Sequence, residues 1–174
     1  SDEDYGISLL NDCKYGHEVN EHKMILTLLK APIKPDPKSD RGDHYFTYSL
    51  YPHAETWKKA KTLERGLEIN HPLVPVDIKS EGELGADKSF ITLASDSMTL
   101  EAVKKCEEED AYIIRMVEKK GKSVDASVKF FAPLTYAAEC DLIERNDVPV
   151  EFDGDTISFH ATPFEIKNYK VKIK

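Results

Sequence analysis

Alternation of apolar and polar residues is the dominant pattern along this sequence. Residues 169–173 alternate Tyr, Val and Ile with lysines, and similar alternation runs through residues 45–50, 124–130 and 157–161. Side chains of successive residues in a strand point to opposite faces of the sheet, so a period of two separates an apolar face from a solvated one. These four segments are therefore predicted to be half-buried strands of antiparallel sheets.

Two further segments, 24–29 and 112–117, are apolar at nearly every position. We expect both to be central strands covered on two sides. A short buried helix is the alternative, which the β-branched residues and the short length disfavour. Gly121 and the pair Asp153-Gly154 are predicted to form hairpin turns.

One segment, 54–67, has a helical period instead. Its apolar residues lie three or four positions apart: Trp57, Ala60, Leu63 and Leu67. This spacing predicts one amphipathic helix near 54–67, with Trp57 buried on its apolar face. Pro72, Pro75, Gly82 and Gly85 lie in or beside residues 73–88, where we count few large apolar residues. We place a junction there that divides the chain into domains 1–75 and 76–174. Strand signals then recur every 10 to 12 residues, which is typical of a β-sandwich.

Composition and charge narrow the class of protein. Lys plus Arg is 24 and Asp plus Glu is 32, which gives a net charge of −8 and argues against nucleic-acid binding over the whole surface. No apolar run approaches the roughly 20 residues that a membrane helix needs. Three cysteines without metal-ligand spacing (Cys13, Cys106 and Cys140) are typical of reduced thiols, and with the lack of a signal peptide they favour a cytoplasmic protein. The lack of an initiator Met suggests a processed or excised chain.

Catalytic motifs are hard to find. His17 and His22 flank a turn with two glutamates, where a metal could bind, although solvated turn residues are the simpler interpretation. Neither a Gly-rich phosphate loop nor a nucleophile elbow occurs. The acidic run at 107–110 is predicted to be a solvated hairpin loop. The lysines of the last strand are interpreted as protection of a sheet edge, because no aromatic residues alternate with them to stack on bases.

The Pro-rich loop at 31–43 carries more polar chemistry. Asp36 and Asp40 lie in it beside Arg41 and Asp43. The simplest interpretation is a solvated loop shaped by bonds from side chains to the backbone. The alternative is a loop whose polar groups meet sugar hydroxyls. Arg41-Gly42-Asp43 also spells a cell-adhesion tripeptide, which the missing secretion signal disfavours.

Several ordered motifs resemble the C-terminal region of family 38 glycoside hydrolases, the α-mannosidases, in their cytosolic and bacterial branch. The first is the segment Gly6-Ile7-Ser8-Leu9-Leu10-Asn11-Asp12-Cys13-Lys14-Tyr15-Gly16. The others follow in the order of the family and span nearly the whole chain: residues 28–32, 35–37, 40–44, 46–53, 70–73, 100–105, 141–144 and 163–166.

This resemblance implies an all-β fold of antiparallel β-sandwich domains. Residues 1–75 would be the C-terminal part of a central sandwich, including the linking helix, and residues 76–174 a small terminal sandwich. The zinc, the nucleophile and the acid/base of the family lie in a catalytic domain that this sequence lacks, so no catalytic or metal-binding residue and no cofactor is assigned to this chain. The incomplete first sandwich should leave open edges and apolar surface.

The resemblance also implies sugar-binding residues. In relatives a loop of the central sandwich helps to line the sugar pocket, and Asp36, Asp40, Arg41 and Gly42 occupy the matching stretch. Asp12 and His44 belong to neighbouring motifs of the family. The expected partners are the remaining catalytic part of the mannosidase, mannose-containing oligosaccharides bound by the full enzyme, and a second copy of the chain in a homo-oligomer. Neither nucleic acid nor a membrane is expected.

The leading hypothesis is therefore a non-catalytic C-terminal region of an enzyme that hydrolyses α-linked mannose with retention and with the help of zinc. The fragment alone is predicted to be inactive. The alternative is an independent carbohydrate-binding or protein-interaction β-sandwich.

Overall fold

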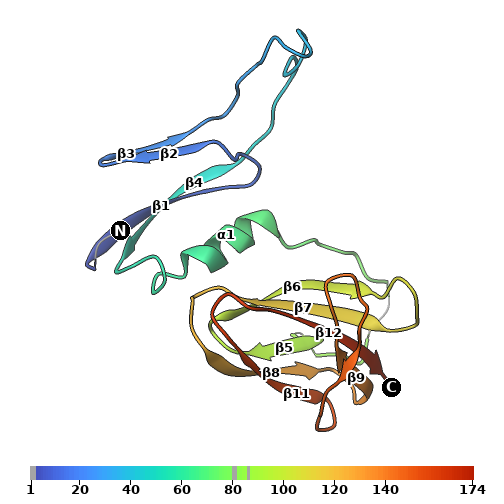
Figure 1. Cartoon of the computed structure of the whole chain (residues 1–174). Coiled ribbons are helices and arrows are strands. Elements are labelled where there is room, and N and C mark those ends of the chain that lie inside the picture. Colours follow the sequence, from blue (N-terminus) through green and yellow to red (C-terminus); the bar gives the residue numbers. More distant parts are fainter. Residues whose placement is uncertain (1–2, 80–81, 86) are drawn as a thin grey trace. The chain divides into compact units, whose positions relative to one another are not determined.

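The computed structural model describes residues 3–79, 82–85 and 87–174. The chain divides into two compact units, residues 1–79 and 80–174, whereas the predicted boundary lies between residues 75 and 76. Residues 80, 81 and 86 of the predicted junction lie outside the described residues. Twelve strands and one helix form in the described part of the chain, so the predicted all-β class with a single helix is confirmed (Figure 1).

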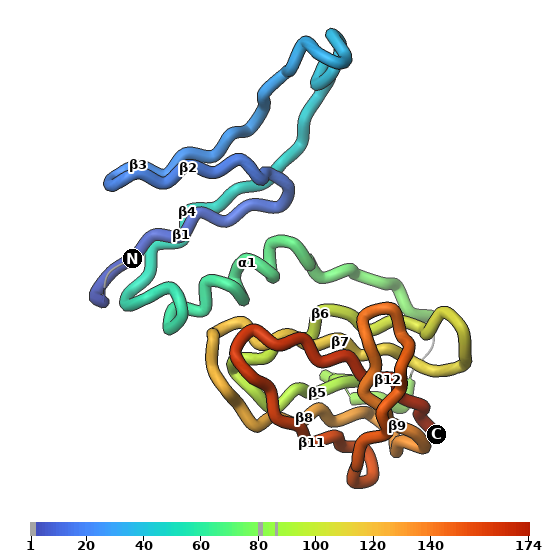
Figure 2. Tube along the Cα trace, viewed as in Figure 1, coloured from blue at the N-terminus to red at the C-terminus, as the bar shows by residue number. Residues whose placement is uncertain are grey.

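The first unit is built from two strand pairs and the helix. Strand β1 (Tyr5–Asn11) pairs antiparallel with β4 (Tyr48–Ala54), and β2 (His17–Asn20) pairs with β3 (Lys23–Leu26) (Figure 2). Helix α1 (Thr62–Asn70) follows β4. Among residues 3–79 only Gly6 and His53 are buried. This unit therefore has strands but no closed hydrophobic core of its own.

The segment at 24–29 differs from its prediction. Strand β3 covers only its first three residues and belongs to a two-stranded hairpin, and Met24, Ile25, Leu28 and Leu29 are all exposed. The apolar run indicated a strand covered on two sides, but of its large apolar side chains only Leu26 is even half-buried. The physical reason is that burial requires a second layer, which a run of apolar residues cannot supply by itself.

Helix α1 begins later than its period predicted. Residues 57–61 form turns, Lys61 adopts a left-handed conformation, and the helix starts at Thr62. Its first residue is tied to the strands, because the Thr62 hydroxyl lies 2.9 Å from Ser8 Oγ, which lies 3.1 Å from His53 Nε2. Trp57 precedes the helix and is 40% exposed, so its predicted burial on a helical face is wrong.

The second unit is a sandwich of two antiparallel sheets. One sheet has the strand order β10-β9-β12-β7-β6 and the other has the order β11-β8-β5. The bounds are β5 Ile91–Ala94, β6 Met98–Lys105, β7 Tyr112–Glu118, β8 Val124–Phe130, β9 Leu134–Glu139, β10 Val148–Pro149, β11 Thr156–Ala161 and β12 Ile166–Ile173. Inward residues of both sheets form one core, which includes Ile114, Met116, Val128, Ile157 and Tyr169. The predicted strands at 112–117, 124–130 and 157–161 are confirmed.

Strand β12 is a central strand, so the interpretation of its lysines as edge protection is wrong. It pairs with β7 on one side and β9 on the other. Lys170 is only 5% exposed, and its Nζ lies 3.0 Å from Glu109 Oε1 and 2.9 Å from Asp147 Oδ1. Burial favours the neutral amine, but these two carboxylates outweigh it and raise the pKa of Lys170. Loop acids therefore cover the face that the alternation assigned to solvent.

The acidic run at 107–110 does connect β6 to β7 as a hairpin loop, as predicted. Glu107, Glu108 and Asp110 are exposed, as predicted, and Glu109 is half-buried. Each acid also pairs with a cation: Glu107 with Lys104, Glu108 with Arg145, Glu109 with Lys170 and Lys172, and Asp110 with Lys105. The ion pairs of Glu109 with Lys170 and Lys172 hold the hairpin loop against the polar face of the sheet.

A buried carboxylate organises the crossing from one sheet to the other. Glu118 ends β7 and accepts hydrogen bonds from the backbone N–H groups of Lys120 (2.9 Å), Gly121 (2.8 Å) and Phe164 (3.0 Å). Burial raises the pKa of Glu118, but these donors lower it to a net value below the ordinary range. The hairpin predicted at Gly121 is wrong, because β7 and β8 belong to different sheets. The tight turn at Asp153-Gly154 is confirmed by the bridge between Asp153 and Thr156.

We predict that Glu118→Ala lowers the free energy of unfolding by about 3 kcal/mol, because it leaves buried backbone donors without an acceptor. Glu118→Gln keeps one acceptor oxygen and should lose less. Urea unfolding followed by circular dichroism measures both. An unfolding free energy of Glu118→Ala equal to that of the parent chain would contradict the role of this carboxylate.

A second prediction concerns pH. The Lys104 ammonium and the backbone N–H of Glu107 lower the pKa of Glu144 to about 2 from the ordinary 4.5. The folded state therefore holds this carboxylate ionised more strongly than the unfolded state does, and the resulting stability is present above pH 4.5 and lost as the pH falls toward 2. The stability difference between the parent chain and Glu144→Gln should shrink over that range in urea unfolding. A difference that stays constant down to pH 2 would refute this account.

Candidate functional site

The loop at 31–43 is closed at its base by side chains predicted from the sequence. Asp40 adopts a left-handed conformation, and its Oδ2 accepts a hydrogen bond from the Ala31 N–H at 3.0 Å. His44 donates through Nε2 to the Asp40 carbonyl oxygen at 2.9 Å. Ser39 donates from its hydroxyl to the Pro32 carbonyl oxygen at 2.6 Å. The structure thus brings Asp40 and His44 together at the C-terminal end of the loop (light blue in Figure 1), and Asp40 joins this end to Ala31 at its start.

The other loop residues are held differently. Asp36 caps its own turn, because its Oδ1 accepts from the Lys38 N–H at 2.8 Å. Arg41 is exposed, and within the described residues its guanidinium has no hydrogen-bond or ion-pair partner. Gly42 has φ +127°, and a Cβ at this position would meet nothing within 4 Å. The loop therefore presents the Arg41 guanidinium next to Gly42, whose backbone is accessible.

Asp12 acts apart from this loop. Both of its carboxylate oxygens accept from the Thr47 N–H, at 3.0 and 2.9 Å, and its own N–H donates to the Thr47 carbonyl oxygen at 3.2 Å. The Thr47 N–H, followed by the Cys13 thiol, lowers the pKa of Asp12. The carboxylate extends the β1–β4 ladder by one step. In the described part of the chain no hydrogen bond joins it to residues 31–44.

Sequence reasoning missed the role of Asn11. Its side-chain oxygen accepts from the backbone N–H groups of Cys13 and Lys14, and its Nδ2 lies 3.2 Å from His17 Nε2. Asn70 of α1 donates to the Asn11 carbonyl oxygen at 3.1 Å. An Asn at the end of a strand is a recognised turn signal, which could have indicated this bend. His17 is exposed and bonds within this turn, in line with the simpler interpretation of solvated turn residues, and among the described residues it joins no group of side chains that could hold a metal ion.

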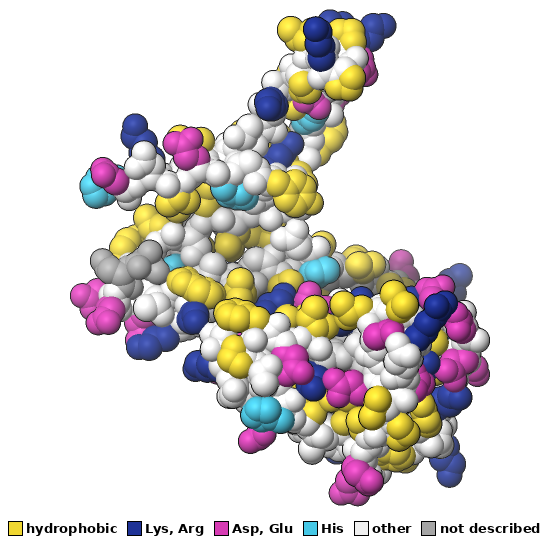
Figure 3. All heavy atoms as spheres, viewed as in Figure 1, with side chains coloured by type: hydrophobic (Ala, Val, Ile, Leu, Met, Phe, Trp, Pro, Cys, Tyr) yellow, Lys and Arg dark blue, Asp and Glu magenta, His cyan; other side chains and the backbone are white. Residues whose placement is uncertain are grey.

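An open apolar groove lies between the two strand pairs of the first unit. It has a volume of about 330 Å³ and is lined by Leu9, Met24, Leu26, Leu28, Tyr48 and Leu50. Figure 3 shows hydrophobic side chains at the surface of this unit. Every lining residue except Tyr48 is aliphatic, so the groove offers hydrophobic contact and no catalytic group.

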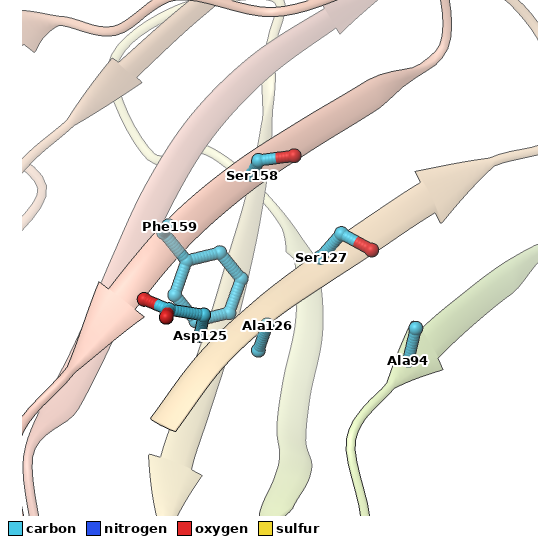
Figure 4. A pocket seen from close by; sticks show the side chains of 6 residues that line it. All are labelled: Ala94, Asp125, Ala126, Ser127, Ser158 and Phe159. Carbon is cyan, nitrogen blue, oxygen red and sulfur yellow. The ribbon is translucent and has the colours of Figure 1, made fainter. Parts of the chain in front are cut away.

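The second unit has a shallow polar depression on its three-stranded sheet (Figure 4). Its volume is about 530 Å³, and it is lined by Ala94, Asp125, Ala126, Ser127, Ser158 and Phe159. Asp125 Oδ1 lies 2.8 Å from His160 Nδ1 on the neighbouring strand. One carboxylate lines this depression, whereas glycoside hydrolysis generally uses a pair flanking the scissile bond.

Neither a cluster of metal-ligating side chains nor a membrane-spanning helix is found in the described residues. Across 3–79, 82–85 and 87–174, no group of three or more His, Cys, Asp and Glu side chains could hold a metal ion. These residues do not fit a zinc ion, and no chemical step is assigned to one in this chain. No helix within the same ranges is long and apolar enough to span a bilayer.

Comparison with known proteins gives consistent matches. Residues 97–169 match the model of the "Glycosyl hydrolases family 38 C-terminal beta sandwich domain", and residues 1–38 match the "Glycosyl hydrolases family 38 C-terminal domain". Human alpha-mannosidase 2C1 is 35% identical over 150 residues, covering 84% of this chain and 14% of that protein. Alpha-mannosidase G of Dictyostelium discoideum is 31% identical over 180 residues, covering 98% and 16%.

The solved structures agree on the fold. A family 38 glycosyl hydrolase protein from Enterococcus faecalis has a TM-score of 0.74 at 18% identity, covering 99% of this chain and 21% of that one. An alpha-mannosidase from Enterococcus faecalis V583 has a TM-score of 0.68 at 17% identity, covering 99% and 20%. The chain thus spans about 14 to 16% of the length of its sequence relatives.

Proposed function

We propose a function from the premise that this chain belongs to glycosyl hydrolase family 38, as a C-terminal region of that family. It serves as a non-catalytic part of an α-mannosidase that hydrolyses α-linked mannose with retention. Its first unit packs against the catalytic part, which holds the zinc and the reacting carboxylates. Three free cysteines, two of them buried, support a cytoplasmic location.

The observation that carries this proposal is the open state of the first unit. Only Gly6 and His53 are buried among residues 3–79, while the groove beside Leu9 and Leu50 is apolar and accessible. Apolar surface that is removed from water contributes about 25 cal/mol per Å². A larger polypeptide that covers these strands would supply the missing layer and make the unit stable.

The loop at 31–43 is the part of this unit suited to meet substrate. The bonds from Asp40 to Ala31 and from His44 to Asp40 fix the ends of the loop, so the tip does not need to order itself on binding. The Arg41 guanidinium offers several donors in a planar fork, which can bridge neighbouring sugar hydroxyls. Gly42 leaves room for a sugar ring to approach the backbone. Asp36 and Asp12 shape the adjoining turns in this proposal.

The isolated chain should show no turnover of an aryl α-mannoside, whereas the full-length polypeptide that contains it should be active. The reason is that a single carboxylate, Asp125, lines the depression of the second unit and none lines the groove of the first, whereas glycoside hydrolysis generally uses a pair. Turnover by the isolated chain, after rigorous removal of contaminating enzyme, would refute the proposal. A saturable change of Trp57 fluorescence with mannose oligosaccharides in the isolated chain would instead favour an independent carbohydrate-binding module.

Arg41→Ala in the full-length enzyme should lower kcat/KM about tenfold or more, because a charge-assisted hydrogen bond contributes about 1.5–3 kcal/mol. Lys38→Ala is the matched control, since it removes another exposed cation from the same loop. Steady-state kinetics on a mannose disaccharide measures both variants. Equal kcat/KM for Arg41→Ala, Lys38→Ala and the parent enzyme would place the loop away from the substrate.

A further inference from the structure

The segment that follows helix α1 exposes an unusual amount of aliphatic surface. Leu73 is 98% exposed, and Val74, Val76 and Ile78 are 81%, 75% and 81% exposed. Single exposed apolar residues are normal on protein surfaces, but a contiguous group marks an interaction site. Four large aliphatic side chains within six residues form such a group, so the description of residues 73–88 as poor in large apolar side chains is wrong for the first part of this range.

The backbone of this segment is also unengaged. Residues 72–79 lie in no helix or strand, and no hydrogen bond joins them to any other described residue. Pro72 and Pro75 fix their own φ angles and favour an extended conformation in the residues before them. In an extended conformation, the free N–H and C=O groups of such a segment can pair with the edge strand of a sheet.

The sequence pattern gives this strand one apolar face and one usable edge. In an extended conformation Val74, Val76 and Ile78 project to the same face, with Pro75 and Asp77 on the other. The backbone groups of residues 74, 76 and 78 point to one edge, where every N–H is present. The opposite edge contains Pro75, which has no N–H to donate. The segment can therefore extend a sheet through the edge of residues 74, 76 and 78, and it closes that sheet on its other side.

We propose that residues 73–78 add as an edge strand to a sheet in the remaining part of the parent mannosidase, with Val74, Val76 and Ile78 buried against it. This inference rests on the proposed function. The sequence relatives carry more than four-fifths of their length outside the region that this chain matches, so a large partner surface belongs to the same polypeptide. Main-chain pairing provides the affinity of such strand addition, and alternate side chains provide its register.

Amide hydrogen exchange tests the docking directly. In the 174-residue chain alone, residues 73–78 should exchange at the rate of an unstructured peptide. In the full-length enzyme the amides of Val74, Val76 and Ile78 should exchange at least 100-fold more slowly. Free exchange of these amides in the full-length enzyme would overturn the inference.

Two proline substitutions test the edge that pairs. Val76→Pro removes an N–H from the pairing edge and should abolish the protection of Val74 and Ile78 in the full-length enzyme. Asp77→Pro removes an N–H from the opposite edge and should leave that protection in place. Equal loss of protection in both variants would overturn the assignment of the edge, and the exchange of the unsubstituted enzyme decides the docking even if a variant fails to fold.

The same exchange experiment distinguishes two other binding partners for residues 73–78, namely a second copy of the chain and another part of this chain. Protection in the 174-residue chain that rises with protein concentration would indicate a second copy, and protection independent of concentration would indicate docking within this chain. Either result overturns the inference. A full-length enzyme with mannosidase activity and free exchange at 73–78 would overturn the inference alone, whereas protection without mannosidase activity would overturn the proposed function alone.

Discussion

Strand β12 has two chemically different faces, and the packing of the second unit depends on covering both. Tyr169 and Val171 fill the sandwich core, while Lys170 is buried on the opposite face between Glu109 and Asp147. A buried ammonium is costly unless it is paired, so the acidic hairpin and the loop after β9 must close over it in a defined arrangement. Arg115 and Asn168 extend this polar layer, because Arg115 Nε donates to Asn168 Oδ1 at 3.1 Å. The carboxylates of the two loops thus cover the Lys170 ammonium on the polar face of the central strand β12.

Different interactions hold the two units together. The second unit closes its own core and anchors its sheet crossing with the buried Glu118. The first unit relies on polar ties: Asp12 to Thr47, and Ser8 to both His53 and Thr62. These ties set the geometry of strands, helix and loop but bury little apolar surface. The strands of the first unit therefore keep apolar surface that a second protein surface can cover.

In the loop at 31–43, hydrogen bonds to the backbone engage most of the candidate sugar-binding side chains. Asp36, Asp40 and His44 all engage the backbone around the loop, whereas the Arg41 guanidinium has no hydrogen-bond or ion-pair partner among the described residues. Asp36 and Asp40 therefore shape the loop through their carboxylates, and Arg41 does not. The sequence placed all four residues in one candidate site, but it could not assign these separate roles, because hydrogen-bond partners depend on where the chain turns.

Local patterns in the sequence determined four strands of the second unit (β7, β8, β11 and β12), the presence of a helix and the tight turn at Gly154, since alternation and turn chemistry act between near neighbours. Tertiary structure decided whether a strand is central or at an edge. The lysines of β12 appeared solvated, and the apolar run at 24–29 appeared buried, yet the packing is the reverse in both cases. Which side chains lose contact with water depends on the elements that cover them, and these elements come from distant parts of the chain.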